Sequence, residues 1–145
     1  MTMSLRLSGW RSLTESELWQ VPDGPGVYEV RCPGPPIPRA LAKDHEMILD
    51  IGESKNLQTR LLGFLRCALG RSKTGHMAGW RFAHLSRRLS FRRRFPVRNL
   101  EFRWRERRTK KAANDAECAR MQRYLRRFGE LPPLNYKFNW ADWVE

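Results

Sequence analysis

Residues 47–61 read Met-Ile-Leu-Asp-Ile-Gly-Glu-Ser-Lys-Asn-Leu-Gln-Thr-Arg-Leu, and they predict a buried strand that leads into a helix. The apolar run over residues 47–51 ends at Gly52, which is typical of a short strand inside a core. A helix is expected to follow, with Ser54 as its N-cap. The rest of the chain can be placed around this strand and helix.

The expected helix has one apolar side. On a helical wheel centred on Leu57, the side chains of Leu61, Phe64 and Ala68 fall within about 40° of it. Arg60 falls about 60° away, at the margin of the apolar stripe. Its aliphatic stem can pack there while its guanidinium reaches along the sheet edge. A solvated surface arginine fits the same position, so the geometry leaves both interpretations open.

The sequence before this stretch predicts another strand. Gly24-Pro25-Gly26 breaks the chain, and Val27-Tyr28-Glu29-Val30 is typical of a strand. Residues 1–24 are expected to form an N-terminal helical extension, with one short helix that ends at Trp19.

The sequence after it predicts a basic segment, a third strand and a long helix. Residues 71–98 are rich in arginine and are expected to contain a helix. Residues 100–105 alternate between apolar and charged types (Leu-Glu-Phe-Arg-Trp-Arg), which is typical of a half-buried strand with a basic outer face. A last helix is expected from Ala112 to Phe128, because Gly129 follows as a natural C-terminal stop.

These elements predict an α+β fold, with a small three-stranded, mainly antiparallel sheet flanked by helices. No internal repeat and no long interior linker divides the 145 residues, so a single domain over 1–145 is expected.

The composition indicates an anionic partner. The formal net charge is +13, carried by 28 basic residues that are mostly arginine. Phosphate neutralisation by such side chains supplies most non-specific affinity for nucleic acid. A membrane partner is not expected, because no segment combines a basic face with a broad apolar one and no run is long enough to span a bilayer. The three scattered cysteines and the lack of a signal peptide predict a reducing, cytoplasmic setting.

Glu117 is the anomaly of the last helix. On a wheel centred on Glu117, the neighbours within about 40° are Ala113, Met121, Tyr124 and Phe128. A carboxylate therefore lies in the middle of an apolar stripe, where an unpaired charge costs several kcal/mol. One interpretation is a buried ion pair, for example with Arg60. The other is a metal ligand, since carboxylate oxygen suits Mg²⁺ and Mn²⁺.

Two further residues carry weaker signals. Tyr28 in a strand is most often a core residue. His76 follows a flexible stretch, where it could act as a general base, contact a substrate or have no chemical role.

Taken in order, these segments resemble the GIY-YIG nuclease family. Pro25-Gly26-Val27-Tyr28 resembles the first signature tripeptide, and Asp50-Ile51-Gly52 resembles the second. Residues 52–61 resemble the glycine-to-arginine stretch that follows it. Ala116-Glu117 resembles the catalytic glutamate, and residues 131–135 (Leu-Pro-Pro-Leu-Asn) resemble the terminal asparagine motif. The resemblance covers about residues 25–135.

The resemblance implies a metal-dependent DNA endonuclease with a GIY-YIG-like fold and one Mg²⁺ or Mn²⁺ ion. Glu117 would bind the cation, and Tyr28 would activate or position the attacking water. Arg60 would neutralise charge on the transition state. Asn135 would hold the site together by hydrogen bonds, and His76 would assist proton transfer.

The sequence departs from the family pattern at three positions. Asp50 stands where the second tyrosine is usual, Glu53 where a basic residue is common, and Phe64 where Tyr or His is common. Asp50 is expected to replace the missing phenol as a base, to attract a second cation, or to mark a slow or inactive member. A non-catalytic nucleic-acid-binding module on a degenerate nuclease scaffold is therefore the alternative function.

The basic segment is expected to grip the DNA backbone without reading its sequence. Its expected contacts are Lys55, Arg87, Arg88, Arg92, Arg93, Arg94, Arg105, Arg107, Arg108, Lys110 and Lys111. No separate specificity domain is visible, so recognition is expected to come from this segment, from a homodimer or from a partner protein.

Overall fold

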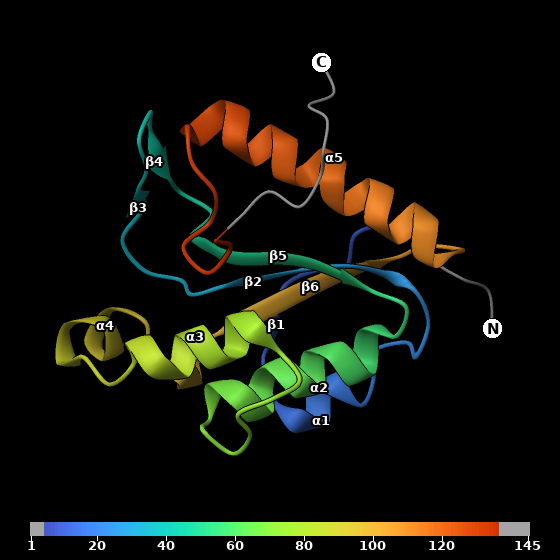
Figure 1. The fold of residues 1–145 in the computed structure, drawn as a ribbon, viewed down its shortest axis with the longest axis horizontal. Coiled ribbons are helices and arrows are strands. Elements are labelled where there is room, and N and C mark those ends of the chain that lie inside the picture. The colour runs from blue at the N-terminus through green and yellow to red at the C-terminus, as the bar shows by residue number, and fades with distance from the viewer. Residues whose placement is uncertain (1–4, 137–145) are drawn as a thin grey trace.

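An antiparallel sheet lies between two layers of helices in the computed structural model, which describes residues 5–136 (Figure 1). The sheet has the spatial order β1-β6-β2-β5, and its strands are β1 (Arg11–Ser12), β6 (Glu101–Glu106), β2 (Gly26–Arg31) and β5 (Ile48–Ser54). A separate two-stranded sheet pairs β3 (Ile37–Pro38) with β4 (Lys43–Asp44). The helices are α1 (Glu15–Leu18), α2 (Leu57–Ala68), α3 (Met77–Leu85), α4 (Leu89–Arg94) and α5 (Lys110–Phe128), with a 3-10 turn at Val97–Asn99.

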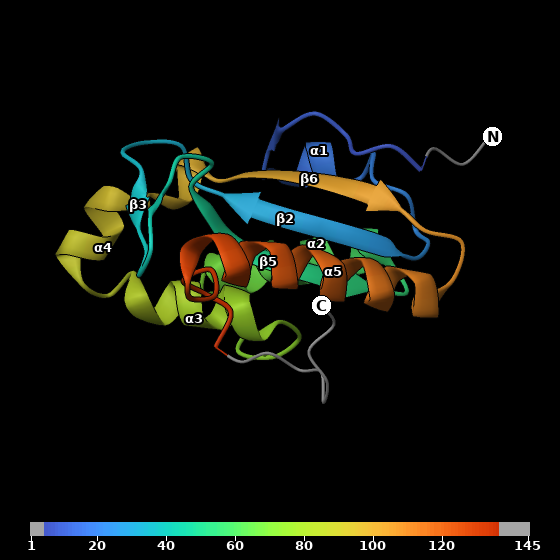
Figure 2. The ribbon, with the colours of Figure 1, turned by 90° about the horizontal axis from the view of Figure 1, so that it is seen from above.

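The helices divide between the two faces of the sheet. Helix α5 crosses one face alone, while α1, α2 and α3 lie on the other, and α4 sits at one end of the molecule (Figures 1 and 2). Strand β5 lies at the edge of the sheet, so no further strand of the sheet pairs with its outer side. Side chains from α3 and α5 can therefore approach this edge. No helix within residues 5–136 is long and apolar enough to cross a membrane.

The predicted α+β class is confirmed, but the predicted strand count of three is wrong. A fourth strand, β1, pairs Arg11 with Phe102 and Ser12 with Glu101. A strand of two residues is too short to show the alternation of apolar and polar residues that indicates a strand in a sequence. The predicted short helix that ends at Trp19 is confirmed: α1 has Thr14 as its N-cap and Trp19 as its C-cap, and it is the helical part of residues 5–24.

The start of α2 differs from the prediction by two residues. Ser54 ends β5 and is not the cap. Instead the side-chain oxygen of Asn56 accepts the backbone N–H of Thr59 at 3.0 Å and caps the helix. Ser54 Oγ accepts the backbone N–H of Asn56 at 3.0 Å, so it supports the cap from two residues earlier. Helix α5 ends as predicted, at Phe128, with Gly129 in the left-handed region at φ 75°.

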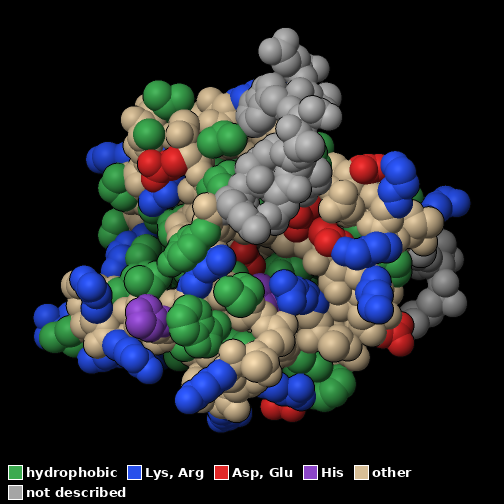
Figure 3. All heavy atoms as spheres, viewed as in Figure 1, with side chains coloured by type: hydrophobic (Ala, Val, Ile, Leu, Met, Phe, Trp, Pro, Cys, Tyr) green, Lys and Arg blue, Asp and Glu red, His purple; other side chains and the backbone are tan. Residues whose placement is uncertain are grey.

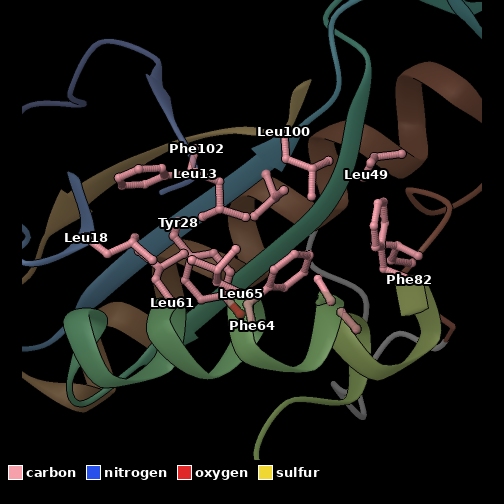
Figure 4. Packing of buried hydrophobic residues seen from close by; sticks show 14 of the residues in the cluster. Leu13, Leu18, Tyr28, Leu49, Leu61, Phe64, Leu65, Phe82, Leu100 and Phe102 are labelled. Carbon is pink, nitrogen blue, oxygen red and sulfur yellow. The ribbon is translucent and has the colours of Figure 1, made fainter. Parts of the chain in front are cut away.

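Gly52 lets the phenol of Tyr28 cross the sheet. The two residues pair directly between β2 and β5. A Cβ atom on Gly52 would lie 2.3 Å from Tyr28 Oη, a distance that no side chain tolerates. Tyr28 is 2% exposed and lies against the α2 side chains Leu61, Phe64 and Leu65 (Figure 4). The glycine therefore sets the path by which the phenol reaches the β5 edge.

The predicted basic outer face of β6 is not an outer face. Arg103 and Arg105 point to the side of the sheet that α5 occupies, and the side chain of Arg103 is only 15% exposed. Buried Glu29 on β2 attracts Arg103 inward, and Arg120 of α5 meets the same carboxylate. Alternation gave the two faces of this strand correctly, but it could not show that the charged face would be covered.

We expect Gly52→Ala to lower the free energy of unfolding by at least about 1–3 kcal/mol, because the added methyl group overlaps the Tyr28 phenol. Urea denaturation measures this change. Gly24→Ala is the matched control, since a Cβ there has no atom within 4 Å. Equal stability of the Gly52→Ala and Gly24→Ala proteins would show that the phenol does not cross Gly52.

Candidate active site

A polar pocket of about 270 Å³ opens at the β5 edge, between α5 and α3. All six residues predicted to be catalytic line it, although they come from five separate parts of the chain: Tyr28, Asp50, Arg60, His76, Glu117 and Asn135. Glu53, Arg81 and Tyr136 complete its polar wall. Acidic, basic and histidine side chains gather in the middle of this face of the molecule (Figure 3).

A short hydrogen bond joins Tyr28 to His76. Tyr28 Oη lies 2.6 Å from His76 Nε2, and both side chains are buried. His76 also caps α3, because its Nδ1 accepts the backbone N–H of Gly79 at 3.3 Å. A neutral imidazole carries one proton, so when Nδ1 accepts, Nε2 must donate. His76 therefore donates to the phenol, and the proton of Tyr28 is left to point elsewhere.

The pKa values of this pair favour the neutral forms. Burial, with Arg60 and Arg81 nearby, lowers the pKa of His76 to about 3, so the imidazole is uncharged at neutral pH. Burial and the adjacent Asp50 raise the pKa of Tyr28 well above its ordinary value, while Arg60 opposes the rise. Tyr28 is thus a phenol that accepts one hydrogen bond from His76 and can donate another into the pocket.

Glu117 faces the pocket from α5 without an ion pair. No basic side chain within residues 5–136 pairs with it, so the interpretation as an Arg60–Glu117 ion pair is wrong. Burial and the nearby Glu53 and Asp50 raise the pKa of Glu117 to about 8, although Lys110 and Arg60 oppose the rise. This carboxyl is mostly protonated at neutral pH unless a cation compensates its charge.

Asp50 and Glu53 add two more carboxyl groups with unused acceptors. Asp50 is 2% exposed, and its Oδ2 atom is buried without a hydrogen-bond partner in the described chain. Burial raises the pKa of Asp50 to about 6, although Arg60 opposes the rise. Glu53 forms an ion pair with Lys110 through Oε1, while its Oε2 is buried and unpartnered among the described residues. Acceptors in this state favour a cation or a proton donor beside them.

Two arginines face the carboxyl groups across the pocket. Arg60 donates from Nη1 to the backbone oxygen of Gly75 at 2.9 Å, which fixes the guanidinium beside the pocket. Arg81 donates to the backbone oxygen of Leu134 at 2.8 Å and lies over the ring of Tyr136, with 3.8 Å between its Cζ and the ring centroid. The pocket therefore has an acidic side and a basic side.

Asn135 fastens the segment after α5 to the open edge of β5. Its side-chain oxygen accepts the backbone N–H of Ile51, and its side-chain nitrogen donates to the backbone oxygen of Ile51, both at 3.0 Å. Leu134 adds a backbone hydrogen bond to Leu49 at 2.9 Å. These bonds act like one more strand on the sheet edge, so they satisfy β5 and close one wall of the pocket.

The donor set fits Mg²⁺ or Mn²⁺ better than zinc. Within the described residues no group of three or more His, Cys, Asp or Glu side chains is arranged to hold a metal ion by itself. A zinc site needs three or four such ligands. Mg²⁺ instead keeps several waters and uses one or two carboxylates together with substrate phosphate oxygens. Glu117 and Asp50 line the same pocket, and Asp50 Oδ2 has no hydrogen-bond partner among the described residues, so the two carboxyl groups fit that requirement.

The predicted DNA-contacting residues fall into two groups at opposite ends of the molecule (Figure 1). One group lies on and just before α4: Arg87, Arg88, Arg92 and Arg93, all exposed, and Arg94, which donates to the backbone oxygen of Pro35. The other lies where β6 leads into α5: Arg105, Arg107, Arg108, Lys110 and Lys111. Lys110 and Lys111 are held in ion pairs with Glu53 and Asp115, and exposed Lys55 precedes α2.

No family model, no curated protein and no solved structure matches this chain.

Sequence reasoning missed Arg81, which lines the pocket. No local pattern marks it, because it reaches the site only through the packing of α3 on α2. Gly79 is the residue in the sequence that could have indicated this packing. A Cβ at Gly79 would lie 2.6 Å from the backbone oxygen of Phe64, so the glycine allows the two helices to touch. A glycine inside a helix costs about 1 kcal/mol, which indicates a close packing contact.

We expect the melting temperature to fall by a few degrees between pH 6.5 and 8.5 in metal-free buffer. The folded pKa of Glu117, about 8, exceeds its ordinary 4.5, so its stabilising proton is present at low pH and is lost as pH rises through 8. The lowered pKa of His76 acts in the opposite sense, but only below pH 6.5. Calorimetry in this window therefore isolates Glu117.

Glu117→Gln should flatten this pH dependence and raise the melting temperature at pH 8. Asp115→Asn, an exposed acid on the same helix, is the matched control and should keep the wild-type slope. Identical slopes for the wild type and Glu117→Gln would contradict the buried, protonated state of Glu117.

Proposed function

We propose that this protein is a divalent-metal-dependent DNA endonuclease of the GIY-YIG type that hydrolyses phosphodiester bonds. The observation that carries the proposal is the convergence of the six predicted catalytic residues, far apart in sequence, on one pocket at the β5 edge. In this proposal the three adjacent strands β6, β2 and β5, with α2 beside them, would correspond to the three-stranded core of a GIY-YIG-like fold. The net charge of +13 and the basic side of the pocket suit an anionic substrate.

Glu117 would hold the cation. Mg²⁺ or Mn²⁺, when bound, would polarise a non-bridging oxygen of the scissile phosphate and stabilise the leaving oxygen. Glu117 suits this role because it has no ion pair within the described residues. Its pKa is raised, so a bound cation would stabilise the ionised carboxylate at neutral pH. Asp50 Oδ2 is the second acceptor available to a cation or to a metal-bound water.

Asp50 is the better proton acceptor, and Tyr28 the better positioning group. Tyr28 keeps its proton at neutral pH and receives a hydrogen bond from His76, so it can orient a water molecule but not deprotonate it. Asp50, with a pKa of about 6, is largely ionised at pH 7 and has a free acceptor in the pocket. It would take the proton as the water oxygen attacks phosphorus, in the place where the family usually has a second tyrosine.

Arg60 and Arg81 would bind the phosphate from the other side. Their backbone hydrogen bonds hold both guanidinium groups in place before any substrate arrives. Fixed cations stabilise the extra negative charge of a five-coordinate phosphorus without reorganisation. Asn135 would maintain the wall that presents β5 to the substrate. We further propose a cytoplasmic setting, which suits three cysteines that form no disulfide.

The alternative is a non-catalytic DNA- or RNA-binding module on a degenerate nuclease scaffold. Asp50 and Glu53 favour it, because two acids in the pocket repel phosphate unless a cation intervenes. This alternative gives salt-dependent binding that does not change in Glu117→Gln, and no turnover in Mg²⁺ or Mn²⁺.

We expect the protein to nick supercoiled plasmid in Mg²⁺ or Mn²⁺ and not in EDTA. Glu117→Gln should abolish cleavage because the cation ligand is lost. Asp50→Asn should slow it by about 10²–10⁴-fold, the usual contribution of a general base. Rates are measured from the conversion of supercoiled to open-circular DNA.

Asp115→Asn is the matched control for both carboxyl variants and should cleave at the wild-type rate, since Asp115 pairs only with Lys111 on the surface. An intact plasmid in both metals would refute the nuclease proposal. Full activity in Asp50→Asn would refute only the role of Asp50 as the proton acceptor.

A further inference from the structure

A second pocket lies on the other flank of α5, between that helix and β6. It also measures about 270 Å³, room for several water-sized groups of roughly 30 Å³ each. Four arginines line it, two from β6 (Arg103 and Arg105) and two from α5 (Arg120 and Arg123). The catalytic pocket takes Glu117 and Met121 from α5, so the helix separates the two sites.

Two of the four arginines are already neutralised. Arg103 Nε lies 2.7 Å from Glu29 Oε2, and Arg120 Nε lies 2.8 Å from Glu29 Oε1. Arg103 also reaches Glu46 at 3.2 Å. Glu29 is 7% exposed and uses both carboxylate oxygens in these bonds, so it has little capacity for a third cation. The inner half of the pocket is therefore a closed ionic network.

The other two arginines have no such partner. The guanidinium groups of Arg105 and Arg123 form no hydrogen bond and no ion pair with any residue between 5 and 136, and Arg105 Nε is buried without an acceptor. Burial lowers the pKa of Arg105, and Arg107 lowers it further. Burial also lowers the pKa of Arg123, with Arg120 and Arg105 adding repulsion. Glu29 opposes both shifts, and Arg123 is exposed to solvent. A guanidinium does not lose its proton near neutral pH, so an anion bound to both groups would offset the remaining repulsion.

We propose that Arg105 and Arg123 bind a phosphodiester group of the nucleic-acid strand in this groove, outside the catalytic pocket. The fork of N–H donors on each guanidinium matches the oxygens of a phosphate. The anion would complete the hydrogen bonding of Arg105 Nε and separate two like charges that face each other across the groove. The strand would then contact both flanks of α5.

This inference rests on the proposed function for the choice of a nucleic-acid strand as the ligand. The affinity of the two guanidinium groups for phosphate oxygens does not depend on that function. A free phosphate offers the same oxygens, so the two sources must be separated by experiment. A strand supplies several phosphates at once, and its affinity therefore depends on length and on salt. Inorganic phosphate has neither a length dependence nor a comparable salt slope.

Arg123→Gln and Arg105→Gln test the site in EDTA, where no cleavage occurs. Binding of a fluorescent duplex, followed by anisotropy over a range of salt concentrations, should weaken about tenfold for each variant, the fold-change expected from one charge-assisted hydrogen bond. The slope of log affinity against log salt should fall by about one. Arg127→Gln, on the exposed last turn of α5, is the charge-matched control and should change both quantities much less.

Thermal denaturation separates this site from a structural role. Arg123→Gln should leave the ligand-free protein as stable as the wild type or more stable, because it removes a repulsion. Arg120→Gln should lower the stability, because it strips a partner from buried Glu29. Loss of stability in Arg123→Gln comparable to that in Arg120→Gln would overturn the proposal.

Four further outcomes decide the inference. Equal weakening by Arg123→Gln and Arg127→Gln would show general charge attraction and overturn it. Competition by inorganic phosphate as effective as that by a duplex of equal phosphate concentration would assign the site to free phosphate and overturn it. If Arg123→Gln and Arg105→Gln specifically weaken binding but the protein never cleaves DNA, the phosphate site is supported and the nuclease proposal is refuted. If the protein cleaves DNA but the salt slopes of the variants are unchanged, the nuclease proposal is supported and the phosphate site is refuted.

Discussion

The contact between the Tyr28 phenol and the bare backbone of Gly52 is the constraint on which the pocket depends. Tyr28 starts on the central strand β2 and ends at the β5 edge only because residue 52 has no side chain. His76 then fixes the phenol from α3, and Gly79 brings α3 close enough to α2 for that bond. Two glycines thus convert an ordinary core tyrosine into a polar group that faces a cavity.

Helix α5 gives the molecule its second organising feature. It crosses one face of the sheet (Figure 2). A polar pocket lies on each flank of the helix: α5 contributes Glu117 to one pocket and Arg120 and Arg123 to the other. On the first flank the pKa of Glu117 is raised to about 8, so this carboxyl is mostly protonated at neutral pH, and on the second flank Arg105 and Arg123 carry like charges. Under the proposed function a metal ion would compensate the charge of Glu117 and a phosphate group would compensate those of the two arginines, and one complex with nucleic acid would supply both.

Much of the fold and most of the pocket could be predicted from local pattern. Helical periodicity identified Glu117 as a carboxylate on an apolar stripe, and the order of motifs placed Tyr28, Arg60 and Asn135 near it. Strand β1 and Arg81 could not be found this way. The first is too short to show a period, and the second depends on how α3 packs against α2. The partial burial of Arg103 on β6 could not be predicted without the position of α5. Alternation along a strand defines its two faces but does not show what packs on each of them.

The central claim, that Glu117 holds a divalent cation beside a bound phosphate, is tested most directly by diffraction. Crystals of the protein with a short DNA duplex and Mn²⁺, measured at the manganese absorption edge, locate the ion by its anomalous scattering. We predict one anomalous peak about 2.0–2.2 Å from a carboxylate oxygen of Glu117, with a phosphate oxygen as a further ligand. A fully occupied manganese peak elsewhere on the protein, with Glu117 still protonated and uncoordinated, would contradict it.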